Sequence, residues 1–395
     1  MRNGRNVKLF VVVAFAALAG ILLYSSMPKA DAQSKTTETF DWRLPKGFPV
    51  PRVPADNPMT AAKVELGRHL FFDKRLSINE KTSCATCHLQ ERAFTEDKKL
   101  SVGTTGDVHP RNSMSLANVA YAASLNWANP SVIHLERQPM VPIFGEDPVE
   151  MGMAGKEDLL IARLKAEPRY ARLFADAFPG EATRITLNQV NYSLASFVRS
   201  LISGNSPYDK YKYGKQPDAI TKAAIRGEQL FFSEHLECMD CHTGFNLSGA
   251  SNYVGKAVEK TEFENNGLYN IDGKGGFPKD NTGLFEFTRK ADDMGKFKVP
   301  TLRNIELTAP YMHDGTIATL DEVIEHYKAG GRTIASGPNK GNGSLNPFKS
   351  AFVPGFRLTP EEKSDLIAFL RSLTDKEFIT DPRYSDPWRS EVRVR

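Results

Sequence analysis

The four cysteines of this 395-residue chain all lie in two copies of the pattern Cys-x-x-Cys-His, at residues 84–88 and 238–242. This pattern is the attachment signature of c-type haem. The two thiols of a copy add to the two vinyl groups of one haem, and the adjacent histidine reaches the iron from the proximal side. The sequence therefore predicts a fold built around two covalently held haems. The residues concerned are Cys84, Cys87 and His88 for the first haem and Cys238, Cys241 and His242 for the second.

Other uses of four cysteines fit the pattern less well. A zinc site built from four thiolates would not need a histidine directly after each pair. A redox-active dithiol is not expected twice with that histidine, and four cysteines are too few for a disulfide scaffold. We therefore favour covalent haem over a zinc site, a thioredoxin-like dithiol and disulfides.

The first 32 residues have the organisation of a secretory signal peptide. A basic start is followed by an apolar run from Leu9 to Leu23 and by Ala30-Asp31-Ala32, a small-residue cleavage site. The run spans about 15 residues, short of the roughly 20 that a spanning helix needs. An N-terminal membrane anchor is the alternative. Either way the folded part is expected outside the cytoplasm, in the periplasm, where thiols are joined to haem.

The balance of charge argues against nucleic acid as a partner. The chain holds 51 Lys and Arg against 47 Asp and Glu, a formal charge of +4. Four of the bases and one of the acids lie in the first 32 residues, which leaves 47 against 46 in the rest. Such a balance offers no broad basic surface for a phosphate backbone.

Two similar segments precede the two haem motifs. Residues 61–72 and 223–232 are both amphipathic at helical spacing, and both end in Leu-Phe-Phe a short loop before Cys-x-x-Cys-His. An internal repeat of this kind indicates two copies of one structural unit. The polar break at residues 203–207 is the predicted linker between them. We expect residues 33–57, which are polar and rich in proline, to form a tether or an arm on the surface.

The remaining sequence is helical or irregular. Apolar residues recur at helical spacing over residues 157–178 and 188–202. Residues 359–362 (TPEE) are the start signal of a last helix, with a capping box and a proline in the first turn. Residues 244–300 are rich in Gly, Asn, Asp and Lys and lack periodicity, so we expect long loops there. The predicted fold class is mainly α, with long irregular connections.

Several longer motifs lie along residues 45–375. They are GRHLFFD at 67–73, SCATCH at 83–88, RN at 111–112, DPVEMG at 147–152, FKVPTLRN at 297–304, TAPYMHDG at 308–315 and TLDEV at 319–323. With these motifs the chain resembles the bacterial dihaem cytochrome c peroxidase family, and its MauG branch in particular. The resemblance implies two cytochrome c-like helical haem domains, here residues 58–205 and 206–395, with calcium between them. It also implies that the C-terminal end can return to pack on the first domain.

In this family the N-terminal haem is the peroxide site, and here that is the His88 haem. The resemblance implies that Glu150 is a distal carboxylate, which can move a proton between the two oxygens of peroxide as the O–O bond breaks. It also implies that Gln138 hydrogen-bonds a bound oxygen species and that Pro142 lines the same pocket and restricts access. The alternative is that both residues are purely structural, with Glu150 as an acidic residue at the start of a helix and Pro142 as a turn residue.

The resemblance assigns two further features to the region between the haems. Trp127 matches the tryptophan that relays electrons or holes between two cofactors too far apart for direct contact. The alternative for Trp127 is an ordinary core tryptophan. Asn112, Thr308 and Pro310 match the calcium ligands of the family, one side-chain oxygen and two backbone carbonyls. Oxygen donors with water suit Ca²⁺, and the alternative is that these three residues only shape turns.

For the distal ligand of the second haem the sequence alone offers Met294, Met312, His326 and Tyr327. Cytochrome c spacing would let Met312 serve. The plain peroxidases supply a methionine eight residues after a Thr-Leu pair begins, and counting from Thr319 leads to Tyr327, as in MauG. A phenolate stabilises oxidised iron and lowers its potential, whereas a thioether stabilises ferrous iron. We therefore expect Tyr327 to be the ligand.

The resemblance implies a periplasmic dihaem oxidoreductase that reacts with hydrogen peroxide at an open first haem. The oxidising equivalents would pass to a periplasmic partner protein, which is a small cytochrome, a cupredoxin or, as in the MauG branch, a protein whose side chains are oxidised. The alternative is a dihaem electron-transfer cytochrome whose irons are both six-coordinate and which has no peroxidase activity.

Overall fold

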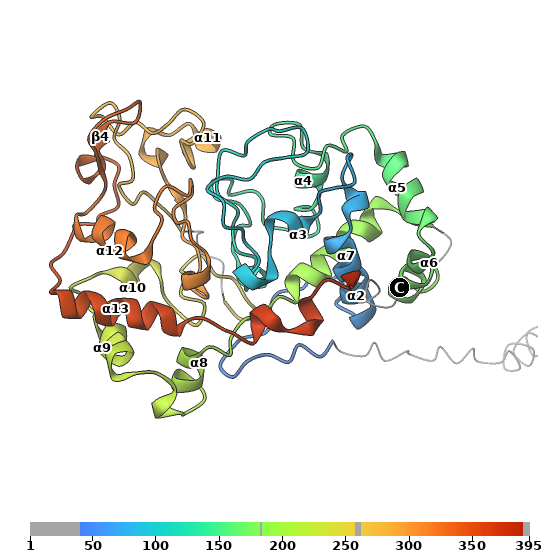
Figure 1. Cartoon of the computed structure of the whole chain (residues 1–395), viewed down its shortest axis with the longest axis horizontal. Coiled ribbons are helices and arrows are strands. Elements are labelled where there is room, and N and C mark those ends of the chain that lie inside the picture. The colour runs from blue at the N-terminus through green and yellow to red at the C-terminus, as the bar shows by residue number, and fades with distance from the viewer. Residues whose placement is uncertain (1–39, 182–183, 257–261, 390–395) are drawn as a thin grey trace, which may run out of the picture. The chain divides into compact units, whose positions relative to one another are not determined.

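The computed structural model describes residues 40–181, 184–256 and 262–389, and Figure 1 shows their arrangement. Residues 40–395 form one of the two units into which the chain divides. The predicted signal peptide, residues 1–32, lies outside the described residues. Within the described ranges, no helix is both long enough and apolar enough to cross a membrane.

Short helices joined by long loops make up most of the structure. The helices are α2 (Ala61–Phe72), α3 (Cys84–Cys87), α4 (Met140–Phe144), α5 (Glu157–Ala166), α6 (Pro168–Ala177), α7 (Leu187–Arg199), α8 (Pro207–Lys212), α9 (Lys222–Phe231), α10 (Cys238–Cys241), α11 (Phe285–Thr288), α12 (Leu320–Lys328) and α13 (Pro360–Ser372). Two antiparallel ladders of two-residue strands pair β1 (Phe263–Glu264) with β2 (Phe297–Lys298) and β3 (Thr333–Ile334) with β4 (Gly341–Asn342). The prediction of a mainly α fold with irregular connections is confirmed.

Capping boxes begin the helices that carry most of the packing. At the start of α7, the Thr186 hydroxyl accepts from the N–H of Gln189, and the Gln189 side chain accepts from the N–H of Thr186. Thr359 and Glu362 make the same reciprocal pair at the start of α13, with Pro360 in the first turn. These boxes satisfy backbone donors that a helix end leaves unpaired. The start signal predicted at residues 359–362 is confirmed.

The periodic run over residues 157–178 forms two helices rather than one. Helix α5 ends at Ala166 and α6 begins at Pro168. Between them Glu167 is extended, with φ −86° and ψ 113°. This conformation is favoured before proline because the ring clashes with a helical residue in front of it. Proline is well tolerated at the first position of a helix, so the chain breaks and restarts where hydrophobic periodicity alone shows no boundary.

Each haem motif follows one helix of a close pair, α2 on α7 and α9 on α13 (Figure 1). A glycine lies at each contact. A Cβ atom on Gly67 would lie 1.9 Å from the carbonyl oxygen of Ser193, and one on Gly227 would lie 2.0 Å from that of Asp365. Because glycine has no side chain, the backbones can approach this closely. Both glycines stand five residues before the end of a Leu-Phe-Phe sequence, so the repeat in the sequence is also a repeat in the packing.

Two hydrophobic cores lie along these two helix pairs. The first includes Leu66, Phe71, Leu194 and Phe197 from α2 and α7, and Phe94 after the first haem motif. The second includes Phe231, Leu366, Phe369 and Leu370 from α9 and α13, and Leu247 after the second haem motif. Each core therefore joins one haem motif to its helix pair.

The C-terminal segment returns from α13 to the first core (Figure 1). Phe378 and Tyr384 are members of that core. The indole N–H of Trp388 donates to the carbonyl oxygen of His69 at 3.0 Å, and Cζ of Arg169 lies 3.9 Å from the centre of the Trp388 ring. The last described residues therefore contact helices of the first core, far from their own place in the sequence.

Two segments without regular secondary structure are nevertheless fixed. Phe48, in the described part of the predicted arm, is buried, with its ring centre 5.0 Å from that of Phe245. In the predicted linker, the carboxylate of Asp375 accepts hydrogen bonds from the backbone N–H groups of Gly204 and Asn205 at 3.0 and 2.9 Å. These hydrogen bonds hold the linker against the segment that directly follows α13. The division of the chain into two domains stays a prediction.

Candidate functional site

The two Cys-x-x-Cys-His motifs adopt the same local structure. Each Cys-x-x-Cys forms one helical turn, α3 or α10, and the histidine is its C-cap. The Nδ1 of His88 lies 2.8 Å from the carbonyl oxygen of Phe94, and the Nδ1 of His242 lies 3.1 Å from that of Leu247. Because a carbonyl only accepts, Nδ1 carries the proton and Nε2 keeps its lone pair for a metal. Both histidines could therefore bind a metal ion through Nε2.

The state of the thiols separates haem attachment from its alternatives. All four cysteines are free, so no disulfide forms among them. Burial raises the pKa of Cys84, Cys238 and Cys241 to about 12 and that of Cys87 to about 11. A redox-active dithiol needs a thiolate of low pKa, so these raised values disfavour a redox role. In the described part of the chain, no group of three or more His, Cys, Asp or Glu residues could hold a metal ion. These findings contradict the disulfide and zinc interpretations and disfavour the dithiol.

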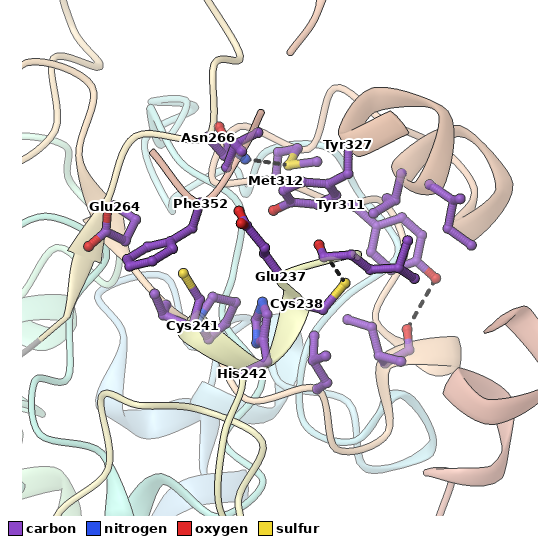
Figure 2. Close-up of a pocket in the computed structure, with 18 of the residues that line it drawn as sticks. Glu237, Cys238, Cys241, His242, Glu264, Asn266, Tyr311, Met312, Tyr327 and Phe352 are labelled. Carbon is purple, nitrogen blue, oxygen red and sulfur yellow. Dashed lines mark hydrogen bonds between the residues drawn. The ribbon is translucent and has the colours of Figure 1, made fainter. Parts of the chain in front are cut away.

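A large apolar cavity adjoins the second motif (Figure 2). Its empty space is about 1380 Å³, the open mouth included, and Cys238, Cys241 and His242 line it. Most of its other walls are aliphatic or aromatic, among them Phe231, Leu236, Phe297, Val299, Ile324 and Leu370. A porphyrin has a broad apolar surface, so the residues present fit a haem that is attached through these cysteines.

Two of the four candidate distal ligands reach this cavity. In Figure 2 the side chains of Tyr327 and His242 enter it from opposite sides, and Met312 lies close to Tyr327. The amide of Asn266 donates to Sδ of Met312 at 3.2 Å. Burial raises the pKa of Tyr327 to about 12, against a side-chain hydrogen bond from Asn266 that lowers it. Without a metal the phenol therefore keeps its proton at neutral pH, and a bound cation would favour its loss.

The other two candidates lie outside the cavity wall. Neither Met294 nor His326 is among the described residues that line it. His326 is buried, and its Nε2–H donates to the carbonyl oxygen of Asn266 at 3.0 Å. It therefore supports the loop that carries Asn266 and is not a surface residue. The structure reduces the candidates to Tyr327 and Met312, and the choice of Tyr327 stays a prediction.

Glu150 lies near the first motif, where its charge raises the pKa of both Cys84 and Cys87. Burial raises the pKa of Glu150 itself to about 7. The residue does not start a helix, since α5 begins at Glu157, so the interpretation as a helix-start acid is wrong. A carboxyl group with this pKa exchanges its proton readily near neutral pH, as a general acid or base requires.

Pro142 and Gln138 belong to the segment next to Glu150. The backbone N–H of Met151 donates to the carbonyl oxygen of Pro142 at 2.9 Å, which brings Pro142 beside Glu150. Pro142 lies within α4 and is not a turn residue. In the turn that leads into α4, Oε1 of Gln138 is buried and has no hydrogen-bond partner among the described residues. A buried acceptor of this kind is costly unless a donor reaches it, and a bound oxygen species with O–H groups would satisfy it.

Trp127 and the three predicted calcium ligands meet at a second cavity, with about 890 Å³ of empty space. Asn112, Thr308 and Pro310 all line it. Trp127 lines both this cavity and that of the second motif, and its indole N–H donates to the carbonyl oxygen of Asn112 at 2.8 Å. The residues supply oxygen donors of the kind that calcium takes. Trp127 lies at the boundary of two cavities rather than deep in a core.

Sequence reasoning missed two residues of these walls. Lys298 lines both cavities, although it was quoted only as one letter of the motif at 297–304. A lysine inside an apolar stretch was the signal that could have found it. Asn266 comes from the region predicted as loops, and no sequence pattern there distinguishes it from its neighbours.

Comparisons with known proteins find relatives that match most of this chain. The family described as "Di-haem cytochrome c peroxidase" matches residues 61–217. A cytochrome-c peroxidase of Denitromonas iodatirespirans is 35% identical over 86% of this chain and 87% of its own. The methylamine utilization protein MauG of Methylorubrum extorquens is 33% identical over 84% and 83%. A crystal structure titled as a MauG-like protein associated with microbial copper homeostasis is 48% identical, with a TM-score of 0.86 over 89% of this chain and all of that one.

Proposed function

This chain belongs to the di-haem cytochrome c peroxidase family, in its MauG-like branch. From that premise we propose that its two haem sites have different roles in the reaction with peroxide. As a member of the family it is a di-haem peroxidase with two c-type haems. The proposed peroxide site is the iron held by His88, and the iron held by His242 is proposed to be closed by Tyr327. The two sites lie in the cytochrome c-like units expected at residues 58–205 and 206–395.

The observation that carries the peroxide site is Glu150. The residue is half-buried near the first motif, close enough for its charge to act on both thiols, and the burial of its carboxyl group raises its pKa to about 7. The haem iron, once bound, supplies the electrons that break the O–O bond. Glu150 takes a proton from one peroxide oxygen and delivers it to the other, so that water can leave. Gln138 accepts a hydrogen bond from the bound oxygen species, and Pro142 narrows the space beside it.

The second site stores and transmits charge. Tyr327 enters the cavity opposite His242 (Figure 2), and its phenol, once deprotonated at the metal, favours oxidised iron. Trp127 lines the cavity of this site and couples it to the first. One calcium ion, held by Asn112 and the carbonyls of Thr308 and Pro310, orders the segments around Trp127.

The electrons come from a protein in the periplasm. Candidate donors are a small cytochrome, a cupredoxin or a protein whose side chains are oxidised in the process. The 48% identical structure is titled as associated with microbial copper homeostasis, so a donor that handles copper is a specific candidate. A low-potential second haem favours oxidation of a protein side chain over that of a reduced cytochrome, because phenolate ligation retains oxidising equivalents.

Titration of the ferric holoprotein with peroxide tests this function. Electron paramagnetic resonance and absorption spectra should show a high-spin component, assigned to the first haem, that changes as peroxide is added. Only low-spin signals that peroxide leaves unchanged, even after partial reduction, would make the protein an electron-transfer cytochrome. Steady-state oxidation of a reduced small cytochrome, compared with a mass increase or crosslink in a candidate protein substrate, separates the two classes of donor.

A further inference from the structure

Lys298 is a buried lysine without a carboxylate partner. It is the second residue of β2 and only 6% of its surface is exposed. Its Nζ donates to the carbonyl oxygen of Ser124 at 3.0 Å, and no Asp or Glu in the described ranges forms an ion pair with it. Burial lowers its pKa to about 7. An ammonium group buried in this way is costly unless an anion reaches it.

The position of Lys298 indicates where such an anion would lie. Its backbone N–H donates to the carbonyl oxygen of Trp127 at 2.8 Å, and both residues line the cavity of the second motif and the cavity beside it. Among the described residues that line the first of these cavities, Lys298 is the only lysine or arginine. The second cavity also has Arg303, but that guanidinium already pairs with Asp209 at 2.8 Å. Lys298 is therefore the available cation of this region.

A second polar group lines the cavity of the second motif. His313 is 4% exposed, lines the cavity of the second motif, and has a buried Nε2 without a partner among the described residues. Its ring stacks on Phe297, the residue before Lys298, with centres 3.5 Å apart and planes 9° apart. The polar groups that line this largely apolar cavity thus include one ammonium group and one unpaired imidazole nitrogen, beside the carboxyl groups of Glu237 and Glu264. This is a suitable environment for a carboxylate that enters with a ligand.

A haem brings such carboxylates, because its porphyrin carries two propionate groups. We propose that Lys298 forms an ion pair with a propionate of the His242 haem, with His313 hydrogen-bonded to a propionate of that haem, and thereby positions the haem beside Trp127 and raises its reduction potential. The inference rests on the proposed second haem site and not on peroxide reaching the first. A positive charge near the haem favours the reduced iron, so Lys298 opposes the effect of a phenolate ligand.

The test uses the holoprotein with both haems attached. Lys298→Met should lower the reduction potential of the second haem in a spectroelectrochemical titration, and Lys298→Arg should restore most of the shift. The propionate bending band of that haem should change in the resonance Raman spectrum of Lys298→Met. Lys296→Met, which removes a half-buried lysine that is already paired with Asp293, is the matched control and should leave both measurements unchanged.

A second-haem potential and Raman spectrum in Lys298→Met equal to those of the control would overturn the proposal. If Lys298→Met does not fold with two haems, the same comparison is made with Lys298→Gln, which keeps a polar side chain but no charge. The peroxide titration of the first haem is recorded on the same samples. Loss of the peroxide reaction in the unmutated protein would end the proposed function, whereas the Lys298 shift would still be measurable.

Discussion

The regions around His88 and His242 hold their histidines in the same way but differ in the side chains gathered near them. Both histidines end a single helical turn and donate from Nδ1 to a backbone carbonyl. Near the first lies Glu150, with a pKa raised to about 7 by burial. The cavity of the second has Tyr327 and Met312. The repeated unit therefore positions both histidines alike, and the proposed difference in chemistry comes from unrepeated segments, the one before α5 and the one that leads into and forms α12.

The largest effect is expected from a substitution that disables the first site and leaves the second unchanged. Glu150→Gln keeps the size of the side chain but removes the proton acceptor, so the ferric holoprotein should react with peroxide about 10²–10⁴ times more slowly. Stopped-flow absorption measures this rate. Glu146→Gln changes an exposed neighbour and should leave the rate unchanged. An unaltered rate in Glu150→Gln would remove the carboxyl group from the reaction.

The next largest effect is expected from a substitution that changes the second site and leaves the first unchanged. Tyr327→Met should raise the reduction potential of the second haem by on the order of 0.1 V, a fraction of the roughly 0.8 V that axial ligands span. The low-spin resonance of that haem should change at the same time. Tyr311→Phe is the control, because Tyr311 lines the same cavity but donates to the carbonyl oxygen of Ile305. If Tyr327→Met leaves the low-spin signal as it was, Met312 becomes the ligand to test.

A pair of glycine variants tests whether the two helix contacts, α2 on α7 and α9 on α13, are equivalent. Gly67→Ala and Gly227→Ala each place a methyl group against a backbone carbonyl, so each should lower the free energy of unfolding by about 1–3 kcal/mol or more. Thermal unfolding of the holoproteins, followed by circular dichroism, measures the loss. Ala61→Ser, at the exposed start of α2, should cost little. A loss in one glycine variant but not in the other would show that the two helix contacts are not equivalent.

The smallest effect is a pH dependence confined to the first site. Below the pKa of about 7, Glu150 is protonated and cannot accept a proton from peroxide. The rate should therefore fall by up to tenfold per unit as the pH drops below that value, and level off above it. Glu150→Gln should abolish this dependence, and the spectrum of the second haem should not follow it. A wild-type rate that stays flat through neutral pH would contradict the role of Glu150.

Local sequence patterns predicted the parts of the molecule that a few neighbouring residues determine. The haem motifs could be recognised from their own spacing, and the capping box at Thr359 could be recognised from four residues. The break between α5 and α6 was missed because the apolar period continues through Pro168, although the proline itself was the signal. The helix-start interpretation of Glu150 was wrong because the next helix begins seven residues later.

Other features depend on segments that are far apart in the sequence and could not be predicted. The partners of Lys298 include Ser124, 174 residues earlier, and no periodicity relates the two. The residues alone offered four candidate ligands of the second haem, and only the resemblance to the family favoured Tyr327. The path of the chain into α12 is what brings Tyr327 and Met312, but not Met294 and His326, to the cavity wall. The roles of these residues at a haem stay predictions.

The return of the C-terminal segment to the first core has a consequence for how the protein is made. Phe378 and Tyr384 complete the core that surrounds the first haem motif, yet Phe378 leaves the ribosome 290 residues after His88. The first core therefore cannot be completed until the C-terminal segment has been made and has folded back onto it. A chain cut short after α13 would carry both attachment motifs and leave the N-terminal half unfinished.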